Sequence, residues 1–345
     1  MGQSPDSLLY QLQQLENDTE RVNQLCTKAF ELRTIDLDVA LQFANEAEVA
    51  AKQSNSMRHL AKSENILGLL HYKKSNFEQA ILYLKQSLQH HEQLKDEIGV
   101  AMNLANLGNV YSDMNEYQLA EEAYLKSLQI SHKLNHVLQV TRCLINIGTL
   151  KFSQQQFDAS IHQFKTALGY ANQLGDIQLT ATCYNNIGTI FKEQDKLDSA
   201  LLYFEESLKQ KELIGNEIEL ADSYLNLASI YFIQKNYNQA SNFLLLTHNI
   251  ATKKNLQSIL EDYYLQQSQL LEAQQDYKQD MVFLKKHYHL KDSLTTLQPK
   301  ELATTHHLAT VLAPTKTNYA ANYIWMAIYI LLPIIIIITL FKNKR

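Results

Sequence analysis

The sequence predicts an all-α protein: a solenoid of about seven antiparallel helix hairpins, followed by one apolar helix near the C-terminus. Three observations lead to this prediction: where the prolines lie, a pattern that recurs every 40 residues, and an uncharged run close to the end of the chain. Hairpins of one kind cannot bury their apolar sides alone, so they stack in line on one another.

The prolines leave most of the chain free to be helical. There are four, at Pro5, Pro299, Pro314 and Pro333. Proline inside a helix costs roughly 3 kcal/mol, and none lies within residues 6–298. From about residue 18 to residue 297 the apolar residues recur with helical period, and only short polar turns interrupt them.

Each 40-residue unit is predicted to hold two helices and a sharp turn. In the unit that starts at Asp176, a plausible N-cap, we expect a first helix over 177–193, a turn over 194–196 and a second helix over 197–214. Gly215 closes the unit, and Gly or Asn, which favour a left-handed residue after a helix, occupy five of the six equivalent positions. These positions are Asn55, Lys95, Asn135, Gly175, Gly215 and Asn255.

A packing motif recurs in the same register. It consists of a small residue, a second small residue twelve positions later, a large apolar residue four further on and a small one three after that. The five clear copies are Gly68, Ala80, Leu84 and Ser87; Gly108, Ala120, Tyr124 and Ser127; Gly148, Ser160, Phe164 and Ala167; Gly188, Ala200, Phe204 and Ser207; and Ala228, Ala240, Leu244 and Thr247. Small residues let two helices approach closely while large ones fill the space between them.

This motif resembles the tetratricopeptide repeat. The period is 40 rather than the common 34, which is similar to the longer-helix branch found in kinesin light chains and bacterial peptide-sensing regulators. Weaker units precede it, around Ala40, Ala44 and Ala47, and follow it, around Ser268 and Tyr277. The resemblance implies a right-handed superhelix over residues 18–298, after an N-terminal segment of residues 1–17. The family's helix-ending proline is missing from every unit.

Asparagine, an indifferent helix former, recurs at one position of the first helix in four units. In tetratricopeptide arrays that side of the first helix lines the concave groove, and amides both donate and accept hydrogen bonds, which suits the backbone of an extended peptide. The candidate peptide-binding residues are Asn106, Asn109, Arg142, Asn146, Thr149, Thr182, Asn186, Thr189, Asp222 and Asn226. Alternatively, the asparagines bond to one another or to backbone carbonyls and fix the superhelical twist. Because the groove mixes both charges, neither a strongly acidic nor a strongly basic ligand is favoured.

Composition and motifs argue against other kinds of chemistry. A net charge of −5 gives no basic patch for nucleic acid. The three cysteines form no CxxC pair, and Cys143 and Cys183, one repeat apart, are interpreted as packing residues. The histidine clusters lack metal-ligand spacing, and neither a phosphate-binding glycine loop nor a nucleophile elbow is present. We expect no enzyme, no catalytic residue, no metal site and no cofactor.

The end of the chain predicts a membrane anchor. Residues 299–322 read as a linker, 323–341 as a transmembrane helix and 342–345 as a basic tail. The segment from Ile324 to Phe341 holds no charge, and at 1.5 Å per residue it is about 27 Å long, near the thickness of a bilayer core. The lipid bilayer is therefore an expected partner.

Two arguments disagree on the side of the membrane. Basic residues follow the predicted span, which places the C-terminus in the cytoplasm and the repeats outside, in the periplasm. Residues 1–17 lack the features of a signal peptide that would export them. Bacterial sensor histidine kinases and membrane-anchored regulators have a similar order of exported repeats, linker and span. We favour this arrangement, with a missing signal and output domain, over a tail-anchored protein with cytoplasmic repeats.

Together these observations predict a non-enzymatic, membrane-anchored interaction module that binds a peptide or protein segment in the groove of its repeats. Two alternatives stay open. The chain is either a purely structural scaffold, or the sensory half of a signalling receptor without its output domain.

Overall fold

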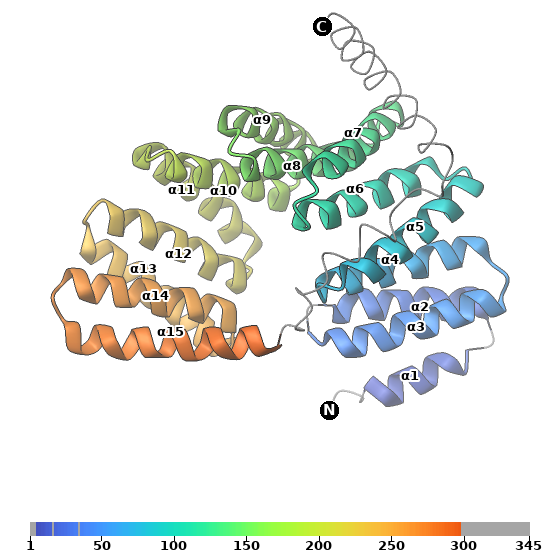
Figure 1. The fold of residues 1–345 in the computed structure, drawn as a ribbon, viewed down its shortest axis with the longest axis horizontal. Helices are drawn as coiled ribbons and strands as arrows, with labels where there is room; N and C mark the ends of the chain where they lie inside the picture. Colours follow the sequence, from blue (N-terminus) through green and yellow to red (C-terminus); the bar gives the residue numbers. More distant parts are fainter. Residues whose placement is uncertain (1–4, 16, 34, 298–345) are drawn as a thin grey trace, which may run out of the picture. The chain divides into compact units, whose positions relative to one another are not determined.

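The computed structural model describes residues 5–15, 17–33 and 35–297, and within these ranges every regular element is a helix (Figure 1). The helices are α1 Pro5–Gln13, α2 Asp18–Leu32, α3 Leu37–Gln53, α4 Met57–Lys73, α5 Phe77–Gln93, α6 Glu97–Asp113, α7 Tyr117–Lys133, α8 Val137–Ser153, α9 Phe157–Leu174, α10 Ile177–Glu193, α11 Leu197–Ile214, α12 Glu217–Ile233, α13 Tyr237–Lys253, α14 Gln257–Ala273 and α15 Tyr277–Leu297. The predicted all-α solenoid is confirmed, and the predicted bounds of α10 and α11 agree with the structure.

Helices α2 to α15 form seven hairpins, each made of an even-numbered first helix and an odd-numbered second helix. Each hairpin packs on the next, so that neighbours in sequence are neighbours in space (Figure 1). The first helices also contact one another across hairpin boundaries, as α6 does with α8 and α8 with α10. The adjoining sides of the first helices therefore form one surface, here called the first-helix face.

Within a hairpin, the predicted motif brings the two helices close together. Gly108 lies so near Tyr124 that a Cβ atom there would be 2.5 Å from the ring. The small residue at the end of the motif adds a hydrogen bond, because the Ser127 hydroxyl donates to the Ala101 carbonyl at 2.6 Å. Ser87, Ser207 and Thr247 donate to the equivalent carbonyls of their own hairpins. The motif is thus a repeated helix-to-helix contact.

The turns contain more left-handed residues than the sequence predicts. All six predicted closing positions have positive φ, including Lys95, the one that is neither Gly nor Asn. A second set lies in the turns inside the six hairpins from α4–α5 to α14–α15: Ser75, Asn115, Gln155, Asp195, Lys235 and Gln275. Most of these residue types have no local preference for positive φ. The packing of the two helices therefore determines the backbone conformation of the turn, whatever residue occupies it.

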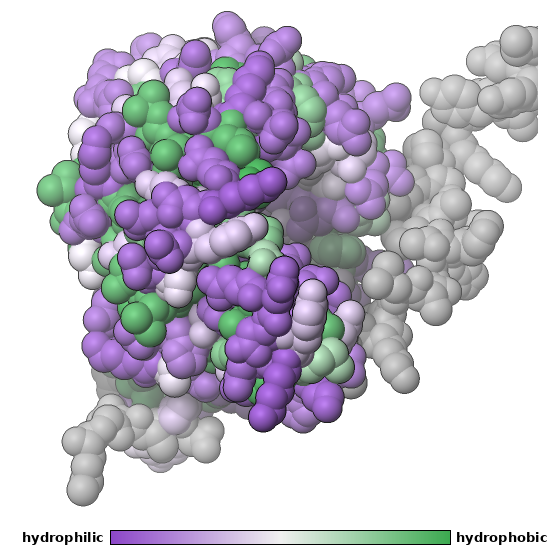
Figure 2. All heavy atoms as spheres, turned by 90° about the vertical axis from the view of Figure 1, so that its left-hand side faces the viewer, coloured by the Kyte–Doolittle hydropathy of each residue, from purple (hydrophilic) through white to green (hydrophobic). Residues whose placement is uncertain are grey.

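The apolar side chains are buried between the hairpins, and Cys143 and Cys183 are fully buried among them, as their interpretation as packing residues requires. Burial raises the pKa of the Cys183 thiol to about 12, so the thiol is protonated at neutral pH. Figure 2 shows one face of the molecule, on which hydrophobic residues are scattered among hydrophilic ones.

The predicted membrane localisation is corrected by the structure. Among the described residues no helix is long and apolar enough to cross a bilayer. These helices carry polar and charged side chains on one side and bury the apolar side against neighbouring helices, so none is apolar all round. The predicted linker 299–322, span 323–341 and tail 342–345, on which the membrane anchor and its lipid partner depended, lie outside the described residues.

The close helix contact leads to a prediction for Gly108→Ala. Its Cβ would overlap the Tyr124 ring, which is buried and cannot move freely because its hydroxyl donates to Asn109 Oδ1 at 2.7 Å. We expect a loss of about 1–3 kcal/mol in the free energy of unfolding, despite the better helix propensity of alanine.

Gly169→Ala is the matched control, because Gly169 lies in α9 with nothing near its missing Cβ. Alanine there should stabilise the protein by up to about 1 kcal/mol. Thermal unfolding followed by circular dichroism compares the two, and equal shifts for both variants would contradict the packing explanation.

Candidate functional site

The ten predicted site residues lie on four consecutive first helices, α6, α8, α10 and α12. All ten are half-buried or exposed, whereas the residues that flank the asparagines, such as Leu107, Ile147 and Leu227, are buried. The predicted stripe therefore belongs to the first-helix face and is open to a partner.

A hollow of about 210 Å³ lies between α6 and α8. Its lining consists of Met102, Ala105, Asn106, Asn109, Gln139, Arg142 and Asn146. Four of the ten predicted residues are thus brought together here, and the other six continue along α8, α10 and α12 outside it. The hollow combines amide groups, one guanidinium and a small apolar surface.

Three of the four recurring asparagines link neighbouring first helices. Asn146 Nδ2 donates to Asn109 Oδ1 at 3.0 Å, between α8 and α6. Asn226 Nδ2 donates to Asn185 Oδ1 at 3.1 Å, between α12 and α10. Asn106 Nδ2 also donates to Asn65 Oδ1 of α4, at 3.4 Å. The structural interpretation of the asparagines therefore holds for these three side chains, which still have donors and acceptors to spare.

Two of these hydrogen bonds are accepted by residues that were not predicted, Asn65 and Asn185. Each lies one position before the recurring asparagine position of its own helix, where the other repeats have apolar residues such as Ile145 and Leu225. A repeat-by-repeat comparison of that neighbouring position would have shown asparagine in two units. The signal was weak because it does not recur in every unit.

Asn186 differs from the other three. Within the described part of the chain its side-chain amide has no hydrogen-bond partner, although it is half-buried. The residue equivalent to Asn109 in the preceding repeat is Thr149, and the Thr149 hydroxyl donates to the Ile145 carbonyl of its own helix at 3.1 Å. The Asn186 amide is consequently available to a ligand.

Asn109 connects the hollow to the packing of its hairpin. Its Oδ1 accepts from both Asn146 Nδ2 and the hydroxyl of Tyr124, the ring that lies against Gly108. Burial of Tyr124 raises the pKa of its phenol, so the phenol stays a neutral donor. Two hydrogen bonds thereby fix the Asn109 side chain at the edge of the hollow.

Arg142 supplies the positive charge of the hollow. It is exposed, and none of the described residues forms an ion pair with it. Beside it, Gln139 is buried and its amide lies 3.7 Å from Cys143 Sγ. The Arg142 guanidinium is therefore free to bind a carboxylate from outside the protein.

Two acidic residues, Asp222 and Asp262, lie two and three repeats after Arg142. Asp222 on α12 lies 3.4 Å from the amine of Lys211, a buried residue of α11. Asp262 occupies the equivalent position on α14, and its pKa is raised by burial first and then by the charges of Glu261 and Asp222, against a smaller opposite effect of His287. Asp262 was not among the predicted residues, although it lies 40 positions after Asp222.

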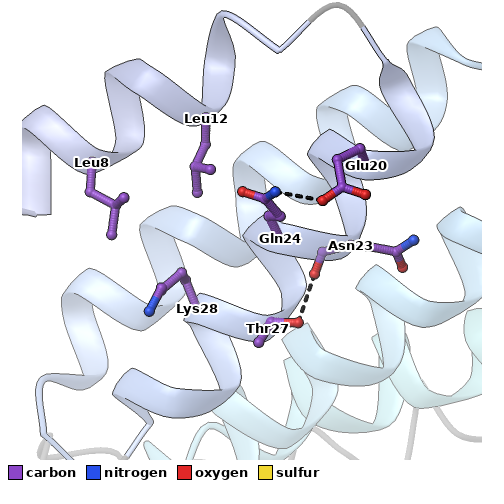
Figure 3. A pocket seen from close by; sticks show the side chains of 7 residues that line it. All are labelled: Leu8, Leu12, Glu20, Asn23, Gln24, Thr27 and Lys28. Carbon is purple, nitrogen blue, oxygen red and sulfur yellow. Dashed lines mark hydrogen bonds between the residues drawn. The ribbon is translucent and has the colours of Figure 1, made fainter.

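A second hollow, of about 340 Å³, lies between α1 and α2 (Figure 3). Leu8 and Leu12 of α1 point toward it from one side, and the other side is lined by polar residues of α2. One of these, Asn23, accepts a hydrogen bond from Lys62 at 2.7 Å. None of the predicted site residues lies here, and the sequence analysis did not predict α1 as a helix.

The described residues include no group of three or more histidine, cysteine or acidic side chains that could hold a metal ion. His90 and His91 each contact a carboxylate, at Glu64 and Asp96, at 2.7 and 2.9 Å. His306 and His307 lie outside the described residues.

The asparagine contacts predict different effects for two similar substitutions. Asn226→Ala removes a hydrogen bond between helices and should lower the free energy of unfolding by about 0.5–1.5 kcal/mol relative to Asn186→Ala. Both variants gain the same helix propensity, so their difference isolates the hydrogen bond. Equal stabilities in thermal unfolding would show that the bond between α12 and α10 contributes nothing.

The charge at Asp262 predicts a dependence of stability on pH. Because its folded pKa is raised above the ordinary 3.8, the fold favours the protonated carboxyl, and that stabilisation is lost as the pH rises through the folded pKa. Asp262→Asn should therefore raise the unfolding temperature at neutral pH, by an amount that shrinks as the pH falls toward 3.8. The control is Glu122→Gln on the exposed side of α7. A gain that does not change with pH would contradict the charge explanation.

Comparison with known proteins agrees with the repeat analysis. Models described as "Tetratricopeptide repeat" match residues 59–133 and 140–213, and a second such model matches residues 220–253. The sequence matched no curated protein.

Several solved structures share the fold. A signal transduction ATPase with numerous domains and a tetratricopeptide repeat sensor, from Pyrococcus horikoshii, is 18% identical with a TM-score of 0.63, over 85% of this chain and 46% of that one. A Rap protein complexed with competence and sporulation factor is 15% identical with a TM-score of 0.55, over 81% and 99%. NprR in complex with its cognate peptide NprX is 14% identical with a TM-score of 0.57, over 95% and 92%.

At these identities the similar structures establish the fold alone. The family models, however, match more than half of the chain in the same register as the helix hairpins. The chain belongs to the tetratricopeptide repeat family.

Proposed function

We propose that this protein is a non-enzymatic interaction module that binds an extended peptide or protein segment on its first-helix face. The observation that carries the proposal is the hollow between α6 and α8, in which Asn106, Asn109, Arg142 and Asn146 converge. These four residues were predicted from the repeat pattern and the family resemblance, and all four line this hollow.

The chemistry of the site suits a peptide backbone. An extended segment presents alternating carbonyl and amide groups, and side-chain amides such as Asn106 and Asn186 can bond to either kind. Arg142 adds a charged donor for a carboxylate. Thr149, Thr182, Thr189, Asp222 and Asn226 extend the same surface over the following repeats.

The known complexes support the choice of a peptide. The Rap protein and NprR structures are complexes with competence and sporulation factor and with the peptide NprX, and their fold extends over most of the present chain. Their low identity gives no guide to the sequence of a ligand here.

The hydrogen bonds between asparagines favour the scaffold alternative only in part. Each of Asn106, Asn146 and Asn226 uses one of its two amide hydrogens in such a bond. Asn186 has no such bond within the described residues. A purely structural role predicts that Asn186 is dispensable, and peptide binding predicts that it is needed. Asn186 therefore separates the two functions.

The test uses phage-displayed random peptides of about twelve residues, which span roughly 40 Å when extended. They are selected on the full chain, and the enriched peptides are synthesised with a fluorophore for anisotropy measurements. We expect Arg142→Ala and Asn186→Ala each to weaken binding about tenfold, which corresponds to 1.4 kcal/mol.

The controls are Lys165→Ala and Asn242→Ala, matched residue types exposed on the second helices α9 and α13. They should bind the selected peptides as the wild type does. If no peptide is enriched over the bare surface, or if both first-helix variants bind as well as their controls, the proposed function is wrong.

A further inference from the structure

The charged residues of the first-helix face follow an order along the stack of repeats. One repeat position, which contains Arg142, is exposed or half-buried in six successive first helices. Its residues are, in chain order, Lys62, Met102, Arg142, Thr182, Asp222 and Asp262. At this one position, cations occur only on α4 and α8 and anions only on α12 and α14, with methionine on α6 and threonine on α10.

The positive end is centred on Arg142 in the hollow. Its guanidinium has no ion-pair partner among the described residues. The other cation, Lys62, donates to the uncharged Asn23 at 2.7 Å, so its charge is not neutralised by this contact. Neither cation thus forms an ion pair with any residue that the structure describes.

The negative end is centred on Asp222 and Asp262. Among the described residues the Lys211 amine forms an ion pair with Asp222 at 3.4 Å, and His287 acts on Asp262 as a smaller opposing charge. The Asp222 side chain is still 51% exposed. Glu261 lies beside Asp262, and the mutual repulsion of these carboxylates contributes to the raised pKa of Asp262. Three carboxylates, those of Asp222, Glu261 and Asp262, thus face one lysine and one histidine, His287, which lies 3.5 Å from Glu261.

The spacing of the two ends suits a short extended segment. Packed helices lie roughly 8–10 Å apart, so two steps of this size along the stack from α8 to α12 add up to about 16–20 Å. An extended chain covers about 3.3 Å per residue, so roughly six residues reach from Arg142 to Asp222 and a few more reach Asp262.

We infer that the occupant of the first-helix face is an extended segment of opposite charges, with its anionic end on α8 and its cationic end on α12 and α14. This inference rests on the proposed function and adds the chemistry of the partner. It agrees with the expectation that neither a strongly acidic nor a strongly basic ligand is favoured, and it adds an order of charges along the stack. A segment with one kind of charge would place like charges together at one end.

The probes are three fluorescent peptides with blocked termini and one common neutral centre, taken from a peptide selected on the full chain. One has two aspartates at one end and two lysines at the other, the second has aspartates at both ends, and the third has lysines at both ends. The wild type should bind the peptide of opposite charges about tenfold more tightly than either of the others.

Two charge reversals test which end of the face recognises which charge. Arg142→Glu should shift the preference to the peptide with lysines at both ends, and Asp262→Lys to the peptide with aspartates at both ends. Neither residue forms an ion pair with a described residue, so both variants should keep the fold. Lys165→Glu on α9 and Glu122→Lys on α7 make the same changes in net charge away from the face, where salt screens them within about 8–10 Å.

The outcomes separate the two proposals. If the neutral centre binds but the three charged versions bind the wild type within about twofold, the charge order is wrong and the proposed function stands. The inference also fails if the control reversals change the preference as much as Arg142→Glu and Asp262→Lys do. If panning selects no peptide at all, the proposed function falls and this inference falls with it.

Discussion

The close contact between the two helices of each hairpin is the constraint on which the rest of this structure depends. A ring such as Tyr124 or Phe204 lies over a residue without a side chain, and a hydroxyl from the second helix bonds to a carbonyl of the first. These contacts or close variants of them recur at a 40-residue interval in the five clear copies of the motif, so these hairpins have similar internal geometry. Identical units stack with a constant offset, and the first helices consequently present the same side to one surface.

The candidate site is built from the same contacts. Asn109 receives one hydrogen bond from the packing ring of its own hairpin and one from Asn146 of the next. The hollow beside it therefore keeps its shape through the fold rather than through a ligand, which reduces the conformational entropy that a bound peptide must offset. A structural role and a binding role of these asparagines are compatible, because an amide has more hydrogen-bonding groups than one contact uses.

The repeat pattern predicted the hairpins, the bounds of α10 and α11 and the packing of glycine against aromatic rings, because each of these recurs in register and depends on local residue type. Features that depend on contacts between repeats were predicted less well. The left-handed Lys95 and Lys235 follow from helix packing, which overrides their local preference. Asn185 and Asp262 have only weak signals in the sequence, an asparagine shared with one other repeat and an aspartate 40 positions after Asp222, and their contacts between helices identified them. The membrane prediction came from one apolar run outside the described residues and had no support from the repeats.

The contacts of the described fold do not account for the asparagine at position 186. Asparagine is less favourable than alanine in a helix by up to about 0.7 kcal/mol. Asn146 and Asn226 offset this cost with a bond to the neighbouring helix, to Asn109 and to Asn185. Asn186 does not, because Thr149 and Ile145 occupy the two equivalent positions on α8. Its amide is half-buried and faces the surface between Arg142 and Asp222 along the stack. Stability of the described fold gives no reason for asparagine at this position, whereas a ligand that spans the two charged ends would cross α10, the helix that carries Asn186.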